Sequence, residues 1–200
     1  NNSNNNNNYN PNDEKKENSK FINLNLIKIF YLNLNKISNI QNLFQFGDLH
    51  ELYLQSNKIK NIPQFEMKNL KKLDLSNNYI KSLEGISNMK NLNNLLIENN
   101  SIRSLNLTDL LQLWNLKEFN ISGNCIESLK ECINLKKIEN MQNLDFSGNE
   151  VSNYSDFRMF MIYYLPNLKI LNRFPVEKNE IFQAKQFFDG RITSDRKSVV

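Results

Sequence analysis

The sequence predicts an α/β fold, a solenoid in which short parallel strands alternate with turns that return along the opposite side. Two observations carry this prediction: a segment of about 22 residues recurs six times, and an asparagine holds the same place in every copy. Glycine and proline, with 5 and 4 residues, are too scarce for a collagen-like or linker protein. Self-similarity at a period of about 20 to 50 residues is typical of repeat architectures.

Each copy fits the pattern L-x-x-L-x-L-x-x-N-x-L, with an apolar residue at every L. The copies begin at Ile27, Leu49, Leu70, Leu92, Leu116 and Met141, and position nine holds Asn35, Asn57, Asn78, Asn100, Asn124 and Asn149. Asparagine makes up 39 of the 200 residues, so composition alone could place some of them there. Composition could not place apolar residues at five fixed offsets in six copies.

The pattern has a direct physical meaning. Side chains alternate along a strand, so positions four and six face the core, and positions three, five and seven point outward. The position-nine amide can both donate and accept, and we expect it to satisfy backbone groups of its own repeat and of the adjacent one. In the returning half, apolar residues recur at every third position, as in Ile80, Leu83 and Ile86, which predicts a 3₁₀ turn or a short helix.

A solenoid needs its ends covered, and the residues after Val151 suggest how. Phe157 to Tyr164 have the apolar spacing of a helix, Ser155 or Asp156 could cap it, and Pro166 should stop it. A final strand at about 169–172 would close the sheet. From residue 176 onward the pattern predicts another helix, ended by Gly190.

The repeats resemble those of the intracellular 22-residue-type leucine-rich repeat (LRR) subfamily. Its C-terminal LRR cap is matched by Phe157-Arg158, Leu165-Pro166, Leu168 and Leu171, with Asn172 in place of the usual aspartate. The resemblance implies a right-handed LRR solenoid of about six repeats plus a C-terminal cap, with a parallel β-sheet of about seven strands on the concave face. We expect residues 1–20 to be an Asn-rich disordered segment or the lead-in to an N-terminal cap. Residues 21–152 would hold the repeats and 153–176 the cap, and 177–200 a helix leading into a further region of a longer chain.

The sequence offers no clear catalytic, phosphate-binding or metal-binding motif. It has neither a glycine-rich phosphate loop nor a Gly-x-Ser-x-Gly turn, and its one histidine, His50, has no partnered nucleophile. With a single histidine, Cys125 and Cys132 cannot complete a zinc site, so we expect free thiols in a reducing compartment. The sequence therefore predicts no enzyme, no cofactor and no metal.

Charge and hydropathy argue against nucleic-acid and membrane partners. The net charge is +4, but the 20 lysines are scattered along the chain and outnumber the 5 arginines, without an evident basic edge. No apolar run approaches about 18 residues. We therefore expect a protein partner and neither direct nucleic-acid binding nor membrane insertion.

The outward positions of the inner, concave face are the best candidates for a binding surface. The predicted partner-binding residues are Ile29, Tyr31, Tyr53, Asp74, Leu96 and Glu98. Exposed aromatic and aliphatic side chains in a row are unusual unless something covers them. The competing interpretation is that the N-terminal segment folds over Ile29 and Tyr31. Trp114 lies off the core series, so it either packs over the fifth repeat or anchors a partner on the convex side.

The resemblance implies a non-catalytic interaction scaffold within a larger assembly, similar to ciliary and axonemal LRR proteins. The expected location is the cytoplasm, with the cilium or axoneme as the specific setting. Two alternatives stay open: a regulatory LRR subunit of a protein phosphatase, for which a longer array is expected, and a spliceosomal-type LRR protein that binds an RNA-binding subunit, for which a basic edge is expected.

Overall fold

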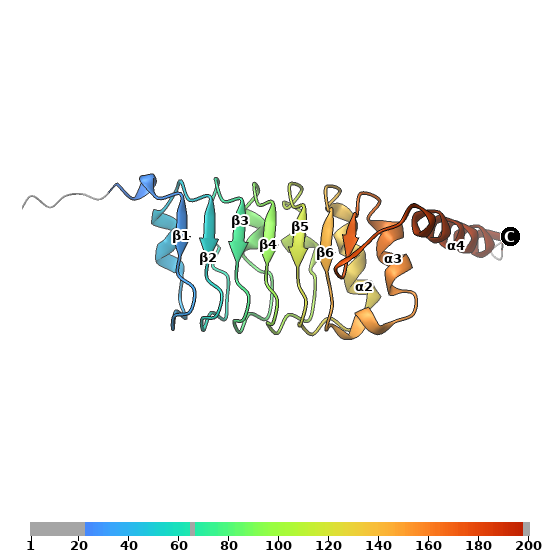
Figure 1. The fold of residues 1–200 in the computed structure, drawn as a ribbon, viewed down its shortest axis with the longest axis horizontal. Helices are drawn as coiled ribbons and strands as arrows, with labels where there is room; N and C mark the ends of the chain where they lie inside the picture. Colours follow the sequence, from blue (N-terminus) through green and yellow to red (C-terminus); the bar gives the residue numbers. More distant parts are fainter. Residues whose placement is uncertain (1–22, 65–66, 198–200) are drawn as a thin grey trace, which may run out of the picture.

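The protein is described by a computed structural model, which covers residues 23–64 and 67–197. The expectations for the Asn-rich segment 1–20 lie outside these residues. The described chain forms one elongated solenoid with the strands side by side, and the C-terminal helix lies at the end opposite the first strand (Figure 1).

One sheet runs the length of the molecule in chain order. Its strands are β1 (Ile29–Tyr31), β2 (Glu51–Tyr53), β3 (Lys72–Asp74), β4 (Asn94–Leu96), β5 (Glu118–Asn120), β6 (Asn143–Asp145), β7 (Ile170–Leu171) and β8 (Phe174–Pro175). The first seven are parallel, and β8 turns back antiparallel to β7. Equivalent repeat positions pair with each other, as Tyr31 with Tyr53 and Tyr53 with Asp74. The predicted α/β repeat solenoid with a parallel sheet is confirmed.

The returning halves of the repeats form short helical elements on the other side. They are η1 (Leu24–Leu26), η2 (Gln41–Gln45), η3 (Ile86–Asn88), α1 (Leu107–Leu110), α2 (Leu129–Cys132), η4 (Ile133–Lys137) and η5 (Glu150–Asn153). Most are single 3₁₀ turns, in agreement with the three-residue apolar spacing. Each repeat therefore adds one strand and one returning turn, and so one layer, to the stack.

The core is a single apolar column between the sheet and these turns. Positions four and six are almost fully buried from the second repeat onward, with Leu52 and Leu54 as examples. In the first repeat the equivalent Phe30 and Leu32 are only half-buried, and Phe30 makes an edge contact with Phe46 at 5.0 Å. The end of the core is thus less covered at the N-terminal repeat.

The position-nine asparagines form a buried ladder along the solenoid. Nδ2 of Asn78 donates to the carbonyls of Leu54 and Leu75, both at 3.0 Å, and its Oδ1 accepts from the backbone N–H of Ile59 at 2.9 Å. The same three-way bonding is made by Asn57, Asn100, Asn124 and Asn149. Each amide therefore ties its own turn to the repeat before it.

The first member of the ladder differs. Asn35 is exposed, and its Nδ2 donates only to carbonyls of its own repeat, those of Leu32 and Asn33, at 3.0 Å. Since the ladder bonds reach back to a preceding repeat, the first repeat offers Asn35 no equivalent partner.

A second row of asparagines was not predicted. Asn69, Asn91, Asn115, Asn140 and Asn167 stand directly before position one of their repeats, and the Nδ2 of each donates to a carbonyl of the preceding repeat at 2.7 to 3.4 Å. These residues line one edge of the solenoid near the start of the strands. The recurring Asn-Leu or Asn-Met dipeptide was the available signal, hidden by the abundance of asparagine.

The C-terminal end of the core is covered by α3 (Phe157–Tyr164). This helix buries Phe157, Met161 and Ile162 against the last repeat, and it ends before Pro166. The expected side-chain cap is wrong, because Asp156 occupies the N-cap position with helical dihedral angles and makes no capping bond. Ser155 instead donates to the Asp156 carboxylate at 3.3 Å.

The final helix, α4 (Lys178–Lys197), runs straight through Gly190, so the predicted stop at that residue is wrong. A glycine inside a helix costs about 1 kcal/mol but does not remove a backbone donor, so the helix can continue when its flanks favour it. Arg158 of α3 anchors α4 through an ion pair with Glu180 at 2.6 Å. Their hydrogen bond raises the pKa of Arg158 and lowers that of Glu180.

The lysines are less scattered than the linear sequence indicated. Repeat position two holds Lys28, His50, Lys71, Asn93, Lys117, Gln142 and Lys169. The carbonyl of each, except the last, accepts from the backbone N–H of the next at 2.7 to 2.9 Å. The four lysines are exposed. This row, the basic edge, corrects the expectation that no such edge exists, since residues about 50 apart in sequence occupy alternate layers of one stack.

Position eight of each repeat has a left-handed backbone conformation, and the first repeat places there a leucine, which disfavours that conformation. Ser56, Asn77, Asn99, Gly123 and Gly148 hold this position in later repeats, whereas Leu34 adopts φ 58° with its side chain 77% exposed. A leucine there costs roughly 1 kcal/mol relative to asparagine.

We therefore expect Leu34→Asn to raise the free energy of unfolding by about 1 kcal/mol, as measured by urea denaturation. Leu26→Asn is the matched control, because Leu26 is equally exposed but is absent from the positive-φ residues. A loss of stability on Leu34→Asn would contradict the expectation and would show that this leucine packs against another part of the chain.

Candidate protein-binding face

The outward side chains of β1 to β7, with the residue two places beyond each strand, form one surface that we call the strand face. The predicted residues Ile29, Tyr31, Tyr53, Asp74 and Leu96 lie on β1 to β4, and Glu98 follows β4. They are brought together in consecutive layers by the parallel register.

An aromatic pair dominates the N-terminal end of the strand face. The rings of Tyr31 and Tyr53 are stacked, with centroids 4.7 Å apart and planes 13° apart. Tyr31 is 66% exposed, and its neighbour Ile29 is also exposed. Tyr53 is half-buried and donates its hydroxyl to Glu51 at 2.7 Å. The hydrogen bond to Glu51 therefore holds the Tyr53 ring in place, while the Tyr31 ring stays open to solvent.

Lys72 continues this arrangement into the next layer. Its Nζ lies 5.2 Å from the centroid of the Tyr53 ring, a cation–π geometry. The hydrogen bond to Glu51 raises the pKa of Tyr53. Desolvation by burial acts to lower the pKa of Lys72, but the contact with Tyr53 and the nearby Glu51 carboxylate outweigh it, so the pKa is raised. Both groups therefore keep their protons at neutral pH.

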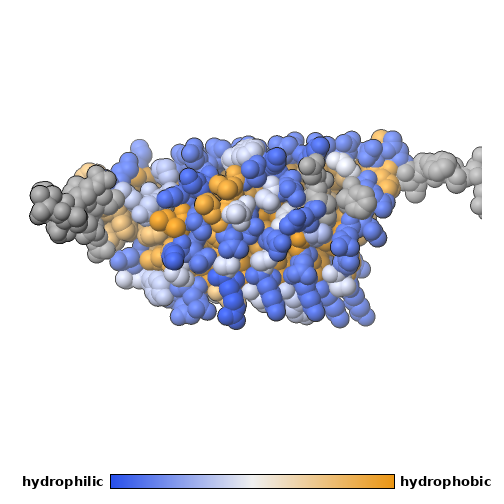
Figure 2. Space-filling view, turned by 180° about the vertical axis from the view of Figure 1, so that it is seen from behind, coloured by the Kyte–Doolittle hydropathy of each residue, from blue (hydrophilic) through white to orange (hydrophobic). Residues whose placement is uncertain are grey.

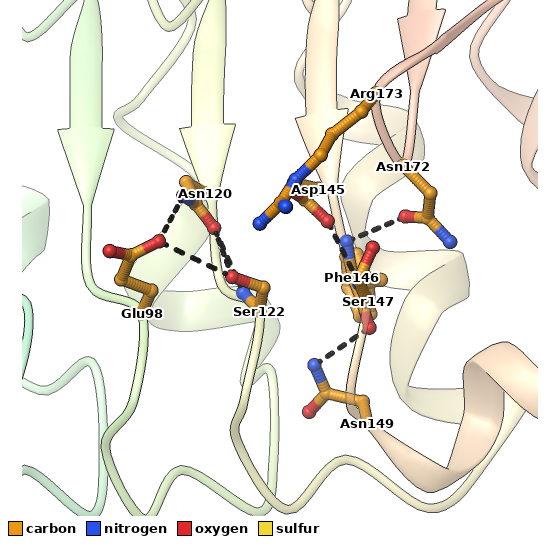
Figure 3. A network of polar contacts seen from close by, with 9 residues as sticks. All are labelled: Glu98, Asn120, Ser122, Asp145, Phe146, Ser147, Asn149, Asn172 and Arg173. Carbon is orange, nitrogen blue, oxygen red and sulfur yellow. Dashed lines mark hydrogen bonds and ion pairs between the residues drawn. The ribbon is translucent and has the colours of Figure 1, made fainter.

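The middle of the strand face carries carboxylates. Asp74 accepts from the backbone N–H of Ser76 at 3.0 Å. Glu98 accepts from Asn120 at 2.7 Å and from the Ser122 hydroxyl at 3.5 Å (Figure 3). Glu118 accepts from the amide of Asn94. We call these three residues, Asp74, Glu98 and Glu118, the acidic centre.

The C-terminal end of the strand face is apolar again. The two-residue turn between β7 and β8 has both residues left-handed, Asn172 at φ 50° and Arg173 at φ 69°. This turn exposes Ile170 and Phe174, the latter at 68%. The last layer of the strand face is therefore apolar, because the hairpin brings Phe174 back beside β7.

Arg173 reaches from this turn over the face and pairs with Asp145 at 2.9 Å (Figure 3). Burial acts to raise the pKa of Asp145, but the hydrogen bonds from Ser147 and the Arg173 guanidinium outweigh it, so the pKa lies below its usual range. The two side chains border a shallow hollow of about 220 Å³, which Glu118, Asn143 and Ile170 also line. Sequence reasoning missed Arg173; its only signal was the Asn-Arg pair between two apolar residues.

Two details of the face depart from the simple outward pattern. Ser76 and Ser122 occupy outward position seven but are buried. Ser122 is covered because Asn120 and Glu98 both bond to its hydroxyl (Figure 3). Asn172, for which the resemblance leads us to expect an aspartate, makes its contact as an amide, with Oδ1 accepting from the backbone N–H of Phe146 at 2.7 Å.

The opposite face offers a rival surface. Its margins are hydrophilic, with hydrophobic residues between them (Figure 2). Leu107, Leu111 and Trp114 are exposed there at spacings of four and three residues, and we call them the convex patch. The exposed Trp114 agrees with its expected place off the core series.

The same residues offer little scope for metal binding, membrane insertion or thiol chemistry. Among residues 23–64 and 67–197, no cluster of three or more histidine, cysteine, aspartate or glutamate side chains could hold a metal ion. Nor does the described part contain a helix long and apolar enough to cross a membrane. Cys125 and Cys132 are both free thiols, and burial raises the pKa of the Cys132 thiol to about 12, which leaves it protonated and unreactive.

The stacked layers, the asparagine ladder and the one-sided sheet define a solenoid protein built from repeats of about 22 residues. The chain belongs to the leucine-rich repeat family, whose profile matches residues 50–199. A chain in the crystal structure of the Drosophila melanogaster SNF/U2A′ complex is similar, with a TM-score of 0.63 and 24% identity over 75% of this chain and 87% of that one.

An internalin (inlF) from Listeria monocytogenes is similar as well. Its TM-score is 0.62 and its identity 20%, over 74% of this chain and 41% of the internalin. This chain thus spans about two fifths of the internalin's length. At these identities both likenesses show the fold alone.

Proposed function

We propose that the protein is a non-catalytic interaction scaffold that binds a partner protein on the strand face. The observation that carries the proposal is the exposed, stacked Tyr31–Tyr53 pair beside Ile29. Aromatic side chains supply contact area at low entropic cost and are enriched at binding hot spots. Here they sit on a rigid sheet, where binding requires little reordering.

We expect Tyr53→Ala to weaken partner binding by about 2 kcal/mol while leaving the fold nearly intact. The ring faces away from the core, and its loss also leaves Tyr31 without its stacking neighbour. The measurement is capture of the endogenous partner on the immobilised chain, followed by titration with the isolated partner. Circular dichroism of the variant checks the fold.

Two variants decide where the partner sits. Ser147→Ala, at the far end of the strand face, should change little. Trp114→Ala changes the convex patch and should also leave binding intact. If Trp114→Ala alone abolishes binding, the partner occupies the convex patch and the strand-face proposal fails.

The cellular setting that we propose is a ciliary or axonemal assembly in the cytoplasm. Its support is the resemblance of the repeats to those of ciliary LRR proteins, together with the polar helix α4 that follows the last layer. Fluorescence microscopy of the tagged protein in ciliated cells tests this setting, and exclusion of the protein from the axoneme would remove it.

A second candidate is the spliceosomal-type LRR protein. The basic edge favours it, because this alternative requires such an edge and the structure aligns Lys28, Lys71, Lys117 and Lys169 along the stack. The likeness to the SNF/U2A′ complex is compatible with it. No observation favours the phosphatase alternative.

If the basic edge faces RNA, a labelled RNA hairpin should bind. Each lysine that contacts a phosphate should then contribute about one unit to the slope of the logarithm of the binding constant against the logarithm of the salt concentration, the salt slope. The Lys71→Gln, Lys117→Gln double variant should then weaken binding and reduce this slope by about two. Filter binding between 50 and 200 mM salt measures both, and absence of binding at the lower salt would show that the basic edge does not contact RNA, which removes the observation that favours this candidate.

A further inference from the structure

The charge on the strand face is opposite to that of the whole chain. The face carries five carboxylates, Glu51, Asp74, Glu98, Glu118 and Asp145, and two cations, Lys72 and Arg173, a net charge of −3. The whole chain has a net charge of +4. The acidity of this face is therefore local, and it coincides with the surface on which we propose that a partner binds.

The two cations of the face already have partners on it. Arg173 pairs with Asp145, and Lys72 lies over the Tyr53 ring between the carboxylates of Glu51 and Glu118. In the part of the chain that the structure describes, no lysine or arginine forms an ion pair with Asp74, Glu98 or Glu118. Their hydrogen bonds come from neutral amides, a hydroxyl and a backbone N–H.

The fold does not require these charges. Asn120 holds the same repeat position as Asp74 and accepts the same bond, from the backbone N–H of Ser122 at 3.0 Å. An amide therefore serves this turn as well as a carboxylate. Three carboxylates in consecutive layers repel one another, which costs stability, and a cation from outside would offset that cost.

We propose that the strand face binds a lysine- or arginine-rich segment of a partner protein, with its basic residues on the acidic centre. This inference rests on the proposed function and names the chemistry of the partner. The acidic centre spans β3 to β5, about 10 Å at the usual strand spacing, and the Tyr31–Tyr53 pair lies about 10 Å further along. A helical segment would place its aromatic or aliphatic anchor about seven residues from the middle of its basic cluster.

The test uses three substitutions that remove charge and keep one side-chain oxygen as an acceptor: Asp74→Asn, Glu98→Gln and Glu118→Gln in one chain. The control chain carries Glu127→Gln, Glu139→Gln and Glu150→Gln, which make the same change in net charge at exposed positions outside the strand face. The probe is a phage-displayed library of random 20-residue peptides selected on the wild-type chain. Enriched peptides are then synthesised and titrated by fluorescence polarisation.

We expect enriched peptides with a cluster of lysine or arginine residues. Their affinity should fall about ten-fold or more in the triple variant at 50 mM salt, stay within about two-fold in the control chain, and weaken as salt is raised. Enriched peptides without basic residues, or basic peptides that bind the triple variant equally well, would overturn the inference.

The experiment separates this inference from the proposed function. Neutral peptides that lose binding on Tyr53→Ala would leave the scaffold role standing and remove only the charge preference. Peptides that are insensitive to both sets of strand-face changes would remove both. Sedimentation of the wild-type chain tests self-association, and a dimer that the triple variant dissociates would replace the partner segment by a second copy.

Discussion

Asn78→Ala should lower the free energy of unfolding by about 3 kcal/mol. The alanine removes the acceptor for the Ile59 N–H and the donor for the Leu54 and Leu75 carbonyls, all in a buried turn. A buried backbone group left unpaired costs about 1 to 3 kcal/mol. Here a donor and three carbonyls, that of Ser76 included, are affected together. Urea denaturation followed by circular dichroism measures the loss.

Asn35→Ala provides the matched control within the same ladder. Asn35 is exposed and bonds only two carbonyls of its own turn, so its loss should cost less than about 1 kcal/mol. Equal losses for the two variants would mean that the effect comes from asparagine in the turn, and the inter-repeat ladder would then contribute little to stability.

The contrast between these two asparagines shows what the repeat pattern could predict. It identified position nine in all six copies and the need for an amide that both donates and accepts. It could not rank the copies, because the partner groups belong to the previous repeat and the first copy has none in the described structure. Ladder energies depend on neighbours, as expected for a solenoid whose layers contact only adjacent layers.

The strand face, like the asparagine ladder, could be predicted only in part. Alternation along each strand identified Tyr31, Tyr53 and Asp74 as outward residues, and the register then followed from equal repeat positions. Arg173 was not predictable, because its reach depends on a hairpin that reverses the chain after β7. The basic edge was obscured for a related reason: Lys71 and Lys117 are 46 residues apart in sequence but only two layers apart in the stack.

The acidic centre and the basic edge together make the solenoid electrically asymmetric. Both arise from repeat positions whose side chains the core does not constrain, so the sequence could vary there without affecting the fold. The core positions, by contrast, accept only apolar residues. A surface of this kind can acquire binding specificity independently of stability, and single substitutions on it should separate the two properties.

Phe157→Ala should cost about 3 to 5 kcal/mol, because it opens a cavity where α3 meets the last repeat. The Phe157 side chain is 2% exposed, and its ring centroid lies 5.7 Å from that of Phe146, which belongs to the last repeat. Repeats are stabilised mainly through contacts with their neighbours, so we expect the loss to loosen the C-terminal layers first.

Relative to the wild-type chain, the Phe157→Ala variant should therefore show a larger increase in hydrogen exchange in β6 and β7 than in β2 and β3. Its urea midpoint should also be lower. Tyr154→Ala, three residues earlier and 47% exposed, is the control and should change stability by less than about 0.5 kcal/mol. Uniform loss of protection across all strands would show that the solenoid unfolds as one cooperative unit. A loss below about 1 kcal/mol would mean that α3 covers the core without stabilising it.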